Sequence, residues 1–600
     1  MSLAQDNKII NPPIMIHNDE IGGVWSPLDR ILCAQVSPLQ FGAIGNGIAD
    51  DTIACQRAAD HAQQIAGAVV FPSGYTFGIQ AMIIIRNGVR GVLGKGGRIQ
   101  YLAGVNMCGI LLAGIHSGNA TNVSECLIDG LHVDCQQRWG VAIYAENVNR
   151  CIITNNTILG VEIGHGIALR CFLDGGGDSY SNIVSNNIVH GNTSSAPQHH
   201  GIVLDSEIDF APYVGADSYW KAIFTAKEAQ YKNTFSVISG NRVLGSYYGI
   251  SLSGIYYSTI TGNVVTENVR NISLQNGCRG NTVTGNTLVD SYSSAVHLAY
   301  GSSNNVISDN NVYSTRANGQ GLLQAYIGSQ FNKFTGNQIT IAGAGNPQWH
   351  LYCAVQSHGN VFSDNVLRGA TSRAYIAVES AFDNTVTNPA HYGYQQSTDV
   401  NNFANGGMSD ISIRNNTIYP SSSAPAIFLA QITDAGGTYA LSNIEVSGNR
   451  VVTSTVSRQL ELYEETTGSL YDVTLKNNLF TSVATLADFV FPRGRQHFSR
   501  CLGNSVVNDS VINFVAGDTT PSIAVGDFFQ HQDVSPTNVT YYDDGVNDQE
   551  IIIRLSTNTT IVNNSNLIRL KGGVNAAGDS NNFVAFRRIS DIWFETWRNF

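Results

Sequence analysis

A short motif repeats along most of the 600-residue chain, and it constrains the fold more than any other feature. Two strand-forming residues precede a small polar residue, an Asn and a short apolar run, as in Ile238-Ser-Gly-Asn241-Arg-Val. From Asn241 to Asn365, successive copies of this Asn are 22, 23, 24, 27 and 28 residues apart. A period of this length is typical of a solenoid, in which each repeat buries its apolar side chains against its neighbours.

Further copies of the motif lie on both sides of this stretch, at Asn156, Asn187, Asn416, Asn449, Asn478 and Asn504. Two intervals are longer than the others. The 51 residues from Asn365 to Asn416 are interpreted as two coils, with a degenerate copy at Val386-Thr-Asn-Pro389. The 54 residues from Asn187 to Asn241 are interpreted as one coil that carries an insertion at about 205–233.

The repeat favours a parallel β-helix over a leucine-rich repeat. Three short strands per coil would stack about 4.8 Å apart, with Val, Ile and Leu pointing inward. Asn at a repeated corner tolerates left-handed backbone angles and can bond the Asn of the next coil. A leucine-rich repeat would need Leu at fixed spacing and a helical half, and neither is visible. Charged residues form only 13% of the chain, against about 25% in average globular proteins, and Gly numbers 60, which also favours turn-rich β structure.

Charge, cysteine usage and hydropathy exclude several classes of protein. The net charge of −12 makes nucleic acid and anionic membranes improbable partners. The ten Cys residues form no Cys-x-x-Cys pair, which predicts buried free thiols in a protein folded in a reducing cytoplasm. The uncharged stretch 65–85 is not a membrane span, because Pro72, Gly74 and Gln80 interrupt it. Asp6 and Lys8 argue against a signal peptide.

The start of the solenoid carries a distinctive block, Phe41-Gly-Ala, Gly45-Asn-Gly47 and Asp50-Asp51-Thr52, followed by Phe71-Pro-Ser-Gly-Tyr75. Between its two halves, helical periodicity from Ile53 to Ala62 predicts a capping helix, with Asp50 and Asp51 at its N-terminus. The block resembles the N-terminal signature of the pectate-lyase-like right-handed β-helix proteins, which include many bacteriophage tailspikes. The resemblance implies the fold and supplies no catalytic residue.

The C-terminal end, with Ile592-Trp-Phe-Glu-Thr-Trp-Arg598, looks like the small β domains that close phage tail spikes and hold three chains together. The two resemblances together imply a homotrimeric tailspike on a phage virion that acts at the bacterial surface. They predict a stalk or linker over 1–37, a β-helix over 38–505 and a C-terminal β domain over 506–600. Tailspikes begin with a virion-docking domain, so the short stretch before Phe41 is interpreted as a truncation.

Candidate site residues cluster between about 140 and 260. Aligning the coils places Glu146, Arg170, Asp205, Ser253 and Gln275 in one outward column. Two coils separate Glu146 from Asp205, or about 9.6 Å between backbones, near the separation of about 6.5–9.5 Å between the carboxyl groups of inverting glycosidases. A salt-bridge ladder on the surface is the alternative interpretation.

Other candidates surround this column. The predicted insertion adds the acids Asp205 and Glu207 and the aromatic residues Tyr213, Tyr219 and Trp220, although a solvated loop is the alternative. A Gly-rich loop adds Asp174 and Asp178. The other proposed sugar-binding residues are His165, His200, Tyr248, Tyr257, Gln275 and His297, and Glu379 is a more distant candidate acid near Tyr326. No zinc or calcium spacing is present, so we expect neither a metal nor a cofactor.

These residues favour an endo-glycosidase that hydrolyses a bacterial capsular or exopolysaccharide. Asp205, Glu207, Glu146, Asp174 and Asp178 are the candidate catalytic carboxylates, because hydrolysis needs one group to protonate the leaving oxygen and another to activate water or attack. Two alternatives stay open. A polysaccharide lyase would need a base and a group that neutralises a uronate, and a binding-only adhesin would need neither.

Overall fold

A computed structural model describes the chain from residue 34 to residue 599, together with the strands β1 (Met15–His17) and β2 (Trp25–Pro27). The description omits residues 103–106, 192–197, 208–231, 317–320, 344–345, 355–356, 381–407, 432, 435–436, 439, 453–459, 465–468, 481–488, 491–497, 503–504, 507–511, 524–527, 546, 548 and 580–581. The chain divides into two compact units. Residues up to 207 and 230–246 form the first unit, and residues 208–229 and 247–600 form the second.

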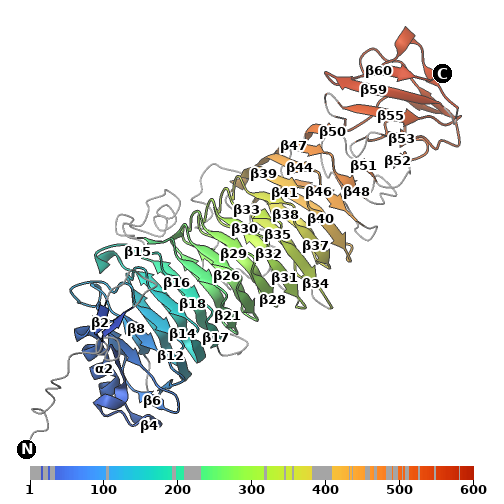
Figure 1. Cartoon of the computed structure of the whole chain (residues 1–600). Helices are drawn as coiled ribbons and strands as arrows, with labels where there is room; N and C mark the ends of the chain where they lie inside the picture. Colours follow the sequence, from blue (N-terminus) through green and yellow to red (C-terminus); the bar gives the residue numbers. More distant parts are fainter. Residues whose placement is uncertain are drawn as a thin grey trace, which may run out of the picture. The chain divides into compact units, whose positions relative to one another are not determined.

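The first unit is built from coils whose strands pair in parallel with the coils before and after them (Figure 1). One sheet receives one short strand from each coil: β8 (Gly91–Leu93), β11 (Leu127–Asp129), β13 (Ile152–Thr154), β16 (Ile183–Ser185) and β20 (Val237–Ser239). Pairing advances from coil to coil without a shift in register, so the buried central residues stack on one another, from Val92 through Ile128 to Ile153.

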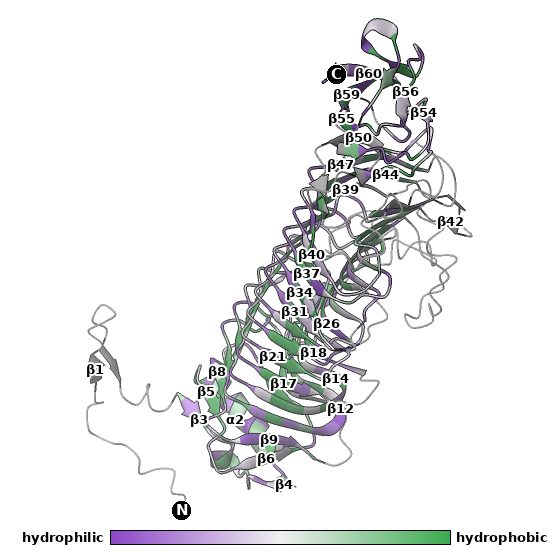
Figure 2. Ribbon diagram, turned by 90° about the vertical axis from the view of Figure 1, so that its right-hand side faces the viewer, coloured by the Kyte–Doolittle hydropathy of each residue, from purple (hydrophilic) through white to green (hydrophobic). Residues whose placement is uncertain are grey.

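The rest of each coil forms two further strand positions. In two coils these positions fuse into the long strands β12 (His132–Glu146) and β14 (Thr157–Cys171). In later coils they are separate, as in β17 (Ile188–Gly191) and β18 (Gln198–Ser206). Figure 2 shows hydrophobic residues on these strands, and each coil thus has the predicted three strand positions around an apolar core.

A buried Asn ladder fixes the corner between coils in the first unit. The backbone N–H and side-chain amide of Asn156 both donate to Oδ1 of Asn187, at 3.0 and 2.9 Å. Asn187 donates to Oδ1 of Asn241 in the same way, at 2.9 Å for both bonds. Asn187 and Asn241 are therefore neighbours in adjacent coils, so the 54-residue interval between them spans one coil, and the insertion at about 205–233 stays a prediction.

Helix α2 (Thr52–Gln64) forms where the sequence predicts the capping helix. Its buried face consists of small residues, among them Ala54, Ala58 and Ala62. Ile53, the first residue of the predicted helical period, is 66% exposed and does not belong to this buried face.

The two acids before the helix have different roles from the predicted double N-cap. Asp50 accepts hydrogen bonds from the backbone N–H and hydroxyl of Thr52, at 3.0 and 2.5 Å. Asp51 makes no side-chain cap and instead accepts from the backbone N–H groups of Ile44 and Gly45, at 2.6 and 3.1 Å. The prediction was wrong for Asp51, whose buried carboxylate holds the preceding Gly-rich turn instead.

The second unit repeats the same architecture through residue 506. Its one-strand-per-coil sheet contains β24 (Thr259–Thr261), β27 (Thr282–Thr284), β30 (Val306–Ser308), β33 (Lys333–Thr335), β36 (Val361–Ser363) and β39 (Met408–Arg414). The Asn ladder runs through it without interruption from Asn263 to Asn478.

The interval from Asn365 to Asn416 is one coil, so its interpretation as two coils was wrong. Asn365 donates directly to Oδ1 of Asn416 through its backbone and side chain, at 3.1 and 2.9 Å. Strand β36 also pairs directly with β39, which leaves no position for a coil between them. The degenerate motif at Val386 lies outside the described residues.

A separate β module ends the second unit. Its main sheet contains β52 (Ile512–Asn513), β53 (Phe528–Gln530), β55 (Glu550–Arg554), β57 (Ile568–Arg569), β59 (Phe583–Ile589) and β60 (Ile592–Arg598). Trp593 is fully buried there and donates its indole N–H to the carbonyl of Tyr542 at 3.0 Å. The predicted domain boundaries at 37/38 and 505/506 stay predictions.

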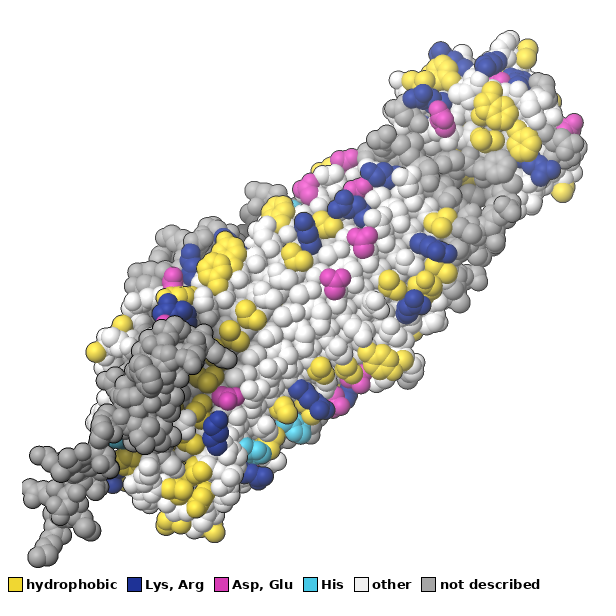
Figure 3. All heavy atoms as spheres, in the orientation of Figure 1, with side chains coloured by type: hydrophobic (Ala, Val, Ile, Leu, Met, Phe, Trp, Pro, Cys, Tyr) yellow, Lys and Arg dark blue, Asp and Glu magenta, His cyan; other side chains and the backbone are white. Residues whose placement is uncertain are grey.

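The architecture confirms the predicted all-β parallel β-helix. The thiols that the structure describes are free and buried, at Cys55, Cys126, Cys135, Cys151, Cys171, Cys278 and Cys353. Figure 3 shows a surface dominated by uncharged groups, with charged side chains scattered among them. Within the described residues, no helix combines the length and hydrophobicity needed to cross a bilayer.

Candidate functional site

The predicted acid–Arg–acid column exists in the first unit. Strand pairing places Glu146 beside Arg170, and Arg170 beside Asp205. The guanidinium of Arg170 donates through Nε and Nη2 to the same oxygen of Asp205, at 3.1 and 2.8 Å. Both side chains reach solvent, with 40% of Arg170 and 22% of Asp205 exposed, so this ion pair forms an accessible polar centre.

The surroundings of Arg170 keep it charged. Burial lowers its pKa, but the Asp205 carboxylate and the Tyr144 hydroxyl outweigh burial and leave the pKa raised. The guanidinium also lies 5.3 Å from the centre of the Phe172 ring. Arg170 therefore connects the acid column to an aromatic surface.

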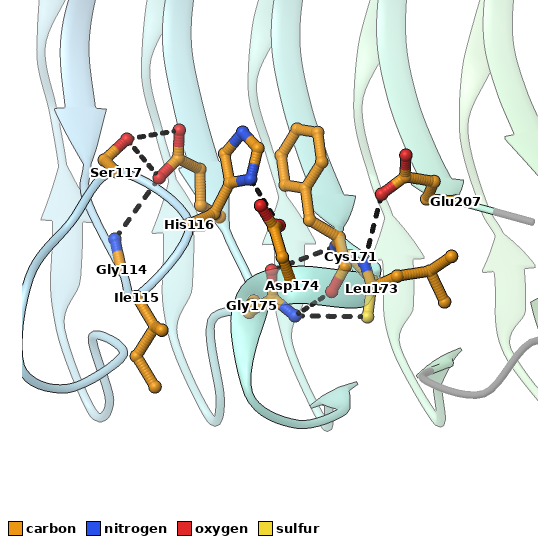
Figure 4. A network of polar contacts seen from close by, with 12 residues as sticks. Gly114, Ile115, His116, Ser117, Cys171, Leu173, Asp174, Gly175 and Glu207 are labelled. Carbon is orange, nitrogen blue, oxygen red and sulfur yellow. Dashed lines mark hydrogen bonds and ion pairs between the residues drawn. The ribbon is translucent and has the colours of Figure 1, made fainter. Parts of the chain in front are cut away.

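Glu146 is in the predicted column but is covered, with 3% of the residue exposed. Ser117 donates its hydroxyl to both carboxylate oxygens, at 2.9 and 2.6 Å, and the backbone N–H of Gly114 donates at 3.3 Å (Figure 4). These donors belong to the loop after β10 (Met107–Leu112). Glu146 thus anchors a loop, a geometry that the coil alignment could not reveal.

The same loop carries a residue that the sequence analysis missed. Nδ1 of His116 lies 2.5 Å from Oδ1 of Asp174, and Figure 4 shows the two side chains facing each other. The imidazole stacks on Phe172, with ring centres 3.6 Å apart and an interplanar angle of 2°. His116 and Asp174 are 33% and 68% exposed. Residue 116 is 58 positions before Asp174 and follows no repeat, so only the folded coils bring the two together.

Asp174 belongs to the 3-10 turn η3 (Leu173–Gly175). The same turn also binds a second predicted acid, Glu207. The backbone N–H of Leu173 donates to Oε2 of Glu207 at 3.0 Å. Glu207 is exposed and immediately follows the strand residues Asp205 and Ser206. Figure 4 shows the turn between His116 and Glu207. Asp205 therefore pairs with Arg170, while Asp174 lies on the turn that follows Phe172 and Glu207 is bound by the same turn.

Asp178 and the predicted histidines are placed less favourably for catalysis. Asp178 accepts a hydrogen bond from the backbone N–H of Lys232 at 2.8 Å. His165 and His200 are neighbours on adjacent coils, with ring centres 5.0 Å apart. Burial lowers the pKa of His165 to about 4 and that of His200 to about 3, so both are neutral at pH 7.

The remaining predicted binding residues that the structure describes lie in the second unit. Tyr248 accepts a hydrogen bond from Arg270 at 3.0 Å. Tyr256 ends β23 (Ile255–Tyr256) and is buried, whereas Tyr257 follows the strand with a φ of 52° and is 57% exposed. Gln275 donates to Ser273 at 2.7 Å. Tyr213, Tyr219 and Trp220 lie outside the described residues.

The more distant candidate acid, Glu379, is completely buried, so its predicted exposure was wrong. It lies at the end of β38 (Ala374–Glu379) and accepts a hydrogen bond from the hydroxyl of Tyr352 at 2.8 Å. Tyr352 stacks on Trp349 with ring centres 4.1 Å apart. His297 is also buried, with a strongly lowered pKa caused by burial and by Arg270. Aligning the coils by their inward residues predicts which side chains point outward from a coil, but it does not predict which other residues cover those side chains.

Comparisons with solved structures show the fold. A tailspike double mutant of E. coli bacteriophage HK620 is 11% identical, with a TM-score of 0.52, covering 82% of this chain and 84% of that one. The chain has the right-handed parallel β-helix fold of phage tailspikes.

Two other similar structures are more distant in shape. The Dettilon tailspike protein is 13% identical with a TM-score of 0.46, over 75% of this chain and 71% of that one. The mannuronan C-5 epimerase A-module (AlgE6) of Azotobacter vinelandii is 13% identical with a TM-score of 0.39, over 79% and 99%. No curated protein matches the sequence.

A sequence family described as periplasmic copper-binding protein (NosD) matches residues 221–367, a minority of the chain. Copper sites are built from clustered His, Cys or carboxylate ligands. Across the parts of the chain that the structure describes, no group of three or more such residues could hold a metal ion. The described residues therefore do not fit a copper site.

Proposed function

We propose that this protein is a phage tailspike that binds a bacterial capsular or exopolysaccharide and hydrolyses its internal glycosidic bonds. The observation that carries the proposal is an exposed cluster of acids in the first unit, in which Asp205 pairs with Arg170 while the turn after Phe172 carries Asp174 and donates a hydrogen bond to Glu207. Glycoside hydrolysis uses paired carboxylates of this kind. The shared fold with a phage tailspike supports the same function.

Asp205 and Glu207 are the pair best placed for the chemistry. Asp205 lies near the end of β18 (Gln198–Ser206), and Glu207 follows the strand and donates its backbone N–H to the carbonyl of Cys171 at 2.8 Å. The two acids are two residues apart, so their backbones are at most about 6.6 Å apart. This backbone separation is compatible with the spacings of about 5 to 9.5 Å between the carboxyl groups of glycosidases. Glu207 would protonate the leaving oxygen, and the Asp205 carboxylate would stabilise the positive charge that develops on the sugar ring.

The charge of the site favours hydrolysis over lyase chemistry. Asp174, Asp205 and Glu207 bring three carboxylates to the site against the one guanidinium of Arg170, so the site is net negative and would repel the uronate that a lyase must bind. Arg170 is already engaged with Asp205 and is poorly suited to neutralise a sugar carboxylate.

The test is digestion of a panel of purified capsular and exopolysaccharides. Hydrolysis releases reducing ends without ultraviolet absorbance from unsaturated sugars, whereas a lyase produces both. Asp205→Asn and Glu207→Gln should each reduce cleavage at least about 100-fold and retain polysaccharide binding. Unsaturated products would overturn hydrolysis, binding without cleavage would indicate an adhesin, and full activity in both variants would place the site elsewhere.

A further inference from the structure

We propose that His116 is the proton acceptor that activates water in this site, with Asp174 and Phe172 as the residues that position it. The inference rests on the proposed hydrolytic function and adds a residue that the carboxylate pair lacks. It also predicts inversion at the anomeric carbon, because water attacks directly while Glu207 protonates the leaving group.

The orientation of the imidazole is determined at two points. Asp174 accepts the proton of Nδ1, which directs the lone pair of the neutral ring to Nε2. The parallel stack on Phe172 fixes the plane of the ring. Phe172 is itself held by buried Asn147, which accepts from its N–H and donates to its carbonyl, both at 3.0 Å. A base whose tautomer and plane are both fixed is prepared for proton transfer.

Glu146 anchors the loop that carries His116. Its carboxylate holds Gly114 and Ser117, on either side of His116 in the loop. Asn122 of the same loop donates to the carbonyl of Gly175, next to Asp174, at 2.7 Å. The two loops are therefore joined by several contacts around the His116–Asp174 pair. Because Glu146 is buried and anchors this loop, it is not itself available to substrate.

Phe172 and Leu173 connect the pair to the proposed acids. Leu173, adjacent to Asp174, donates to Glu207 at 3.0 Å. On the other side, Phe172 connects the imidazole, at 3.6 Å between ring centres, to Arg170 at 5.3 Å, and Arg170 to Asp205 at 2.8 Å. The titratable and charged groups around His116 are thus Asp174, Glu146, Arg170, Asp205 and Glu207.

The proposed step balances as the addition of one water molecule. Nε2 of His116 takes a proton from water while the water oxygen bonds to the anomeric carbon. The bond from that carbon to the leaving oxygen breaks, and the leaving oxygen takes the proton of Glu207. His116 then releases its proton to solvent, and Glu207 regains one from solvent. Asp174 stays ionised and stabilises the imidazolium.

The experiment measures kcat/KM against pH for the wild type and His116→Gln, using a polysaccharide that the wild type cleaves. A base must be deprotonated to accept a proton, so the wild-type rate should fall toward acidic pH. His116→Gln should lose at least about 100-fold in kcat/KM and lose this acidic limb, while binding is retained. Imidazole should restore part of the activity of His116→Gly. His132→Gln, which changes another histidine of the first unit, should leave both rate and profile unchanged.

The outcomes separate this inference from the proposed function. If Glu207→Gln is inactive but His116→Gln retains the wild-type rate, the function stands and the inference is overturned. Loss of rate in His116→Gln with an unchanged pH profile and no imidazole rescue also overturns it, because that result indicates a structural role only. If Asp205→Asn and Glu207→Gln are both fully active, the proposed function itself fails.

Discussion

At the scale of single residues, the buried Asn side chains contribute polar contacts where a solenoid would otherwise leave backbone groups unpaired. Asn310 donates its amide to the carbonyl of Val283 at 2.9 Å and to Oδ1 of Asn337 at 3.0 Å. Its own Oδ1 accepts two bonds from Asn286. Each Asn therefore satisfies groups on the coil before it and the coil after it.

Replacing Asn310 by Ala should destabilise the second unit by at least about 3 kcal/mol, because several buried donors and acceptors lose their partners. Asn311→Ala is the matched control, since Asn311 is exposed on the adjacent position of the chain. Thermal unfolding of both variants measures the difference. Equal melting temperatures would show that the ladder contributes little.

The loop anchor provides a second residue-scale prediction. Glu146→Ala should leave Ser117 and the N–H of Gly114 unpaired and release the loop from 113 to 122. We expect faster limited proteolysis within this loop and a lower melting temperature, with Asn119→Ala as a milder control in the same loop. A Glu146→Ala variant that is as protease-resistant as the wild type would contradict the anchoring role.

What the sequence could predict at this scale was the register, because inward Val, Ile and Leu recur at fixed positions from coil to coil. The alignment therefore put Glu146, Arg170 and Asp205 in the correct column. It could not show that a loop covers Glu146, or that His116 meets Asp174. Both features depend on loops whose lengths follow no period, so no local pattern encodes them.

At the scale of elements, helix α2 closes against the first coils through side chains no larger than Cys and Thr. We therefore expect this buried face to tolerate only small side chains. Ala58 is completely buried, and Ala58→Leu should cost about 1–3 kcal/mol through overpacking. Arg57→Leu adds an apolar side chain on the exposed side and should change stability little. Comparable melting temperatures for the two variants would contradict the packing of α2.

The long intervals show why element boundaries were only partly predictable. Both the 54- and the 51-residue intervals span a single coil, yet the sequence suggested this only for the first. Val386-Thr-Asn-Pro389 matches the corner motif in part, and Asn and Pro are common turn residues in any context. Only strand pairing distinguishes a coil from an insertion.

At the scale of the whole molecule, buried neutral histidines link stability to pH. Burial lowers the pKa of His165, His350 and His531 to about 4, below the ordinary value of 6.5. The unfolded chain therefore binds more protons than the folded chain between pH 6.5 and 4. Stability is fully present above pH 6.5 and should fall as pH decreases through this range.

Melting temperatures from pH 8 to about pH 4 test this linkage. His350→Gln should flatten the dependence in the acidic range, because Gln keeps a donor for the carbonyl of Ala370 but cannot titrate. A melting temperature that is constant over this range, or an unchanged slope in the variant, would contradict it.

The homotrimer stays a prediction of the resemblance to tailspikes, and the isolated protein can test it. Light scattering should give a mass near three times 64.5 kDa. Slow unfolding and a melting temperature above the range of about 45–65 °C typical of mesophilic domains should accompany it. A stable monomer would rule out the assembly.

The Asn ladder also has a consequence for how the chain is built. A finished coil presents unpaired strand edges and a free ladder position to the segment that comes next, as the face of a growing crystal presents lattice sites to arriving molecules. The amides all point the same way along the stack, so this growth has a polarity. Whole coils could then be added or removed during evolution with little change to their neighbours, which would let the length of the solenoid vary in steps of about 4.8 Å.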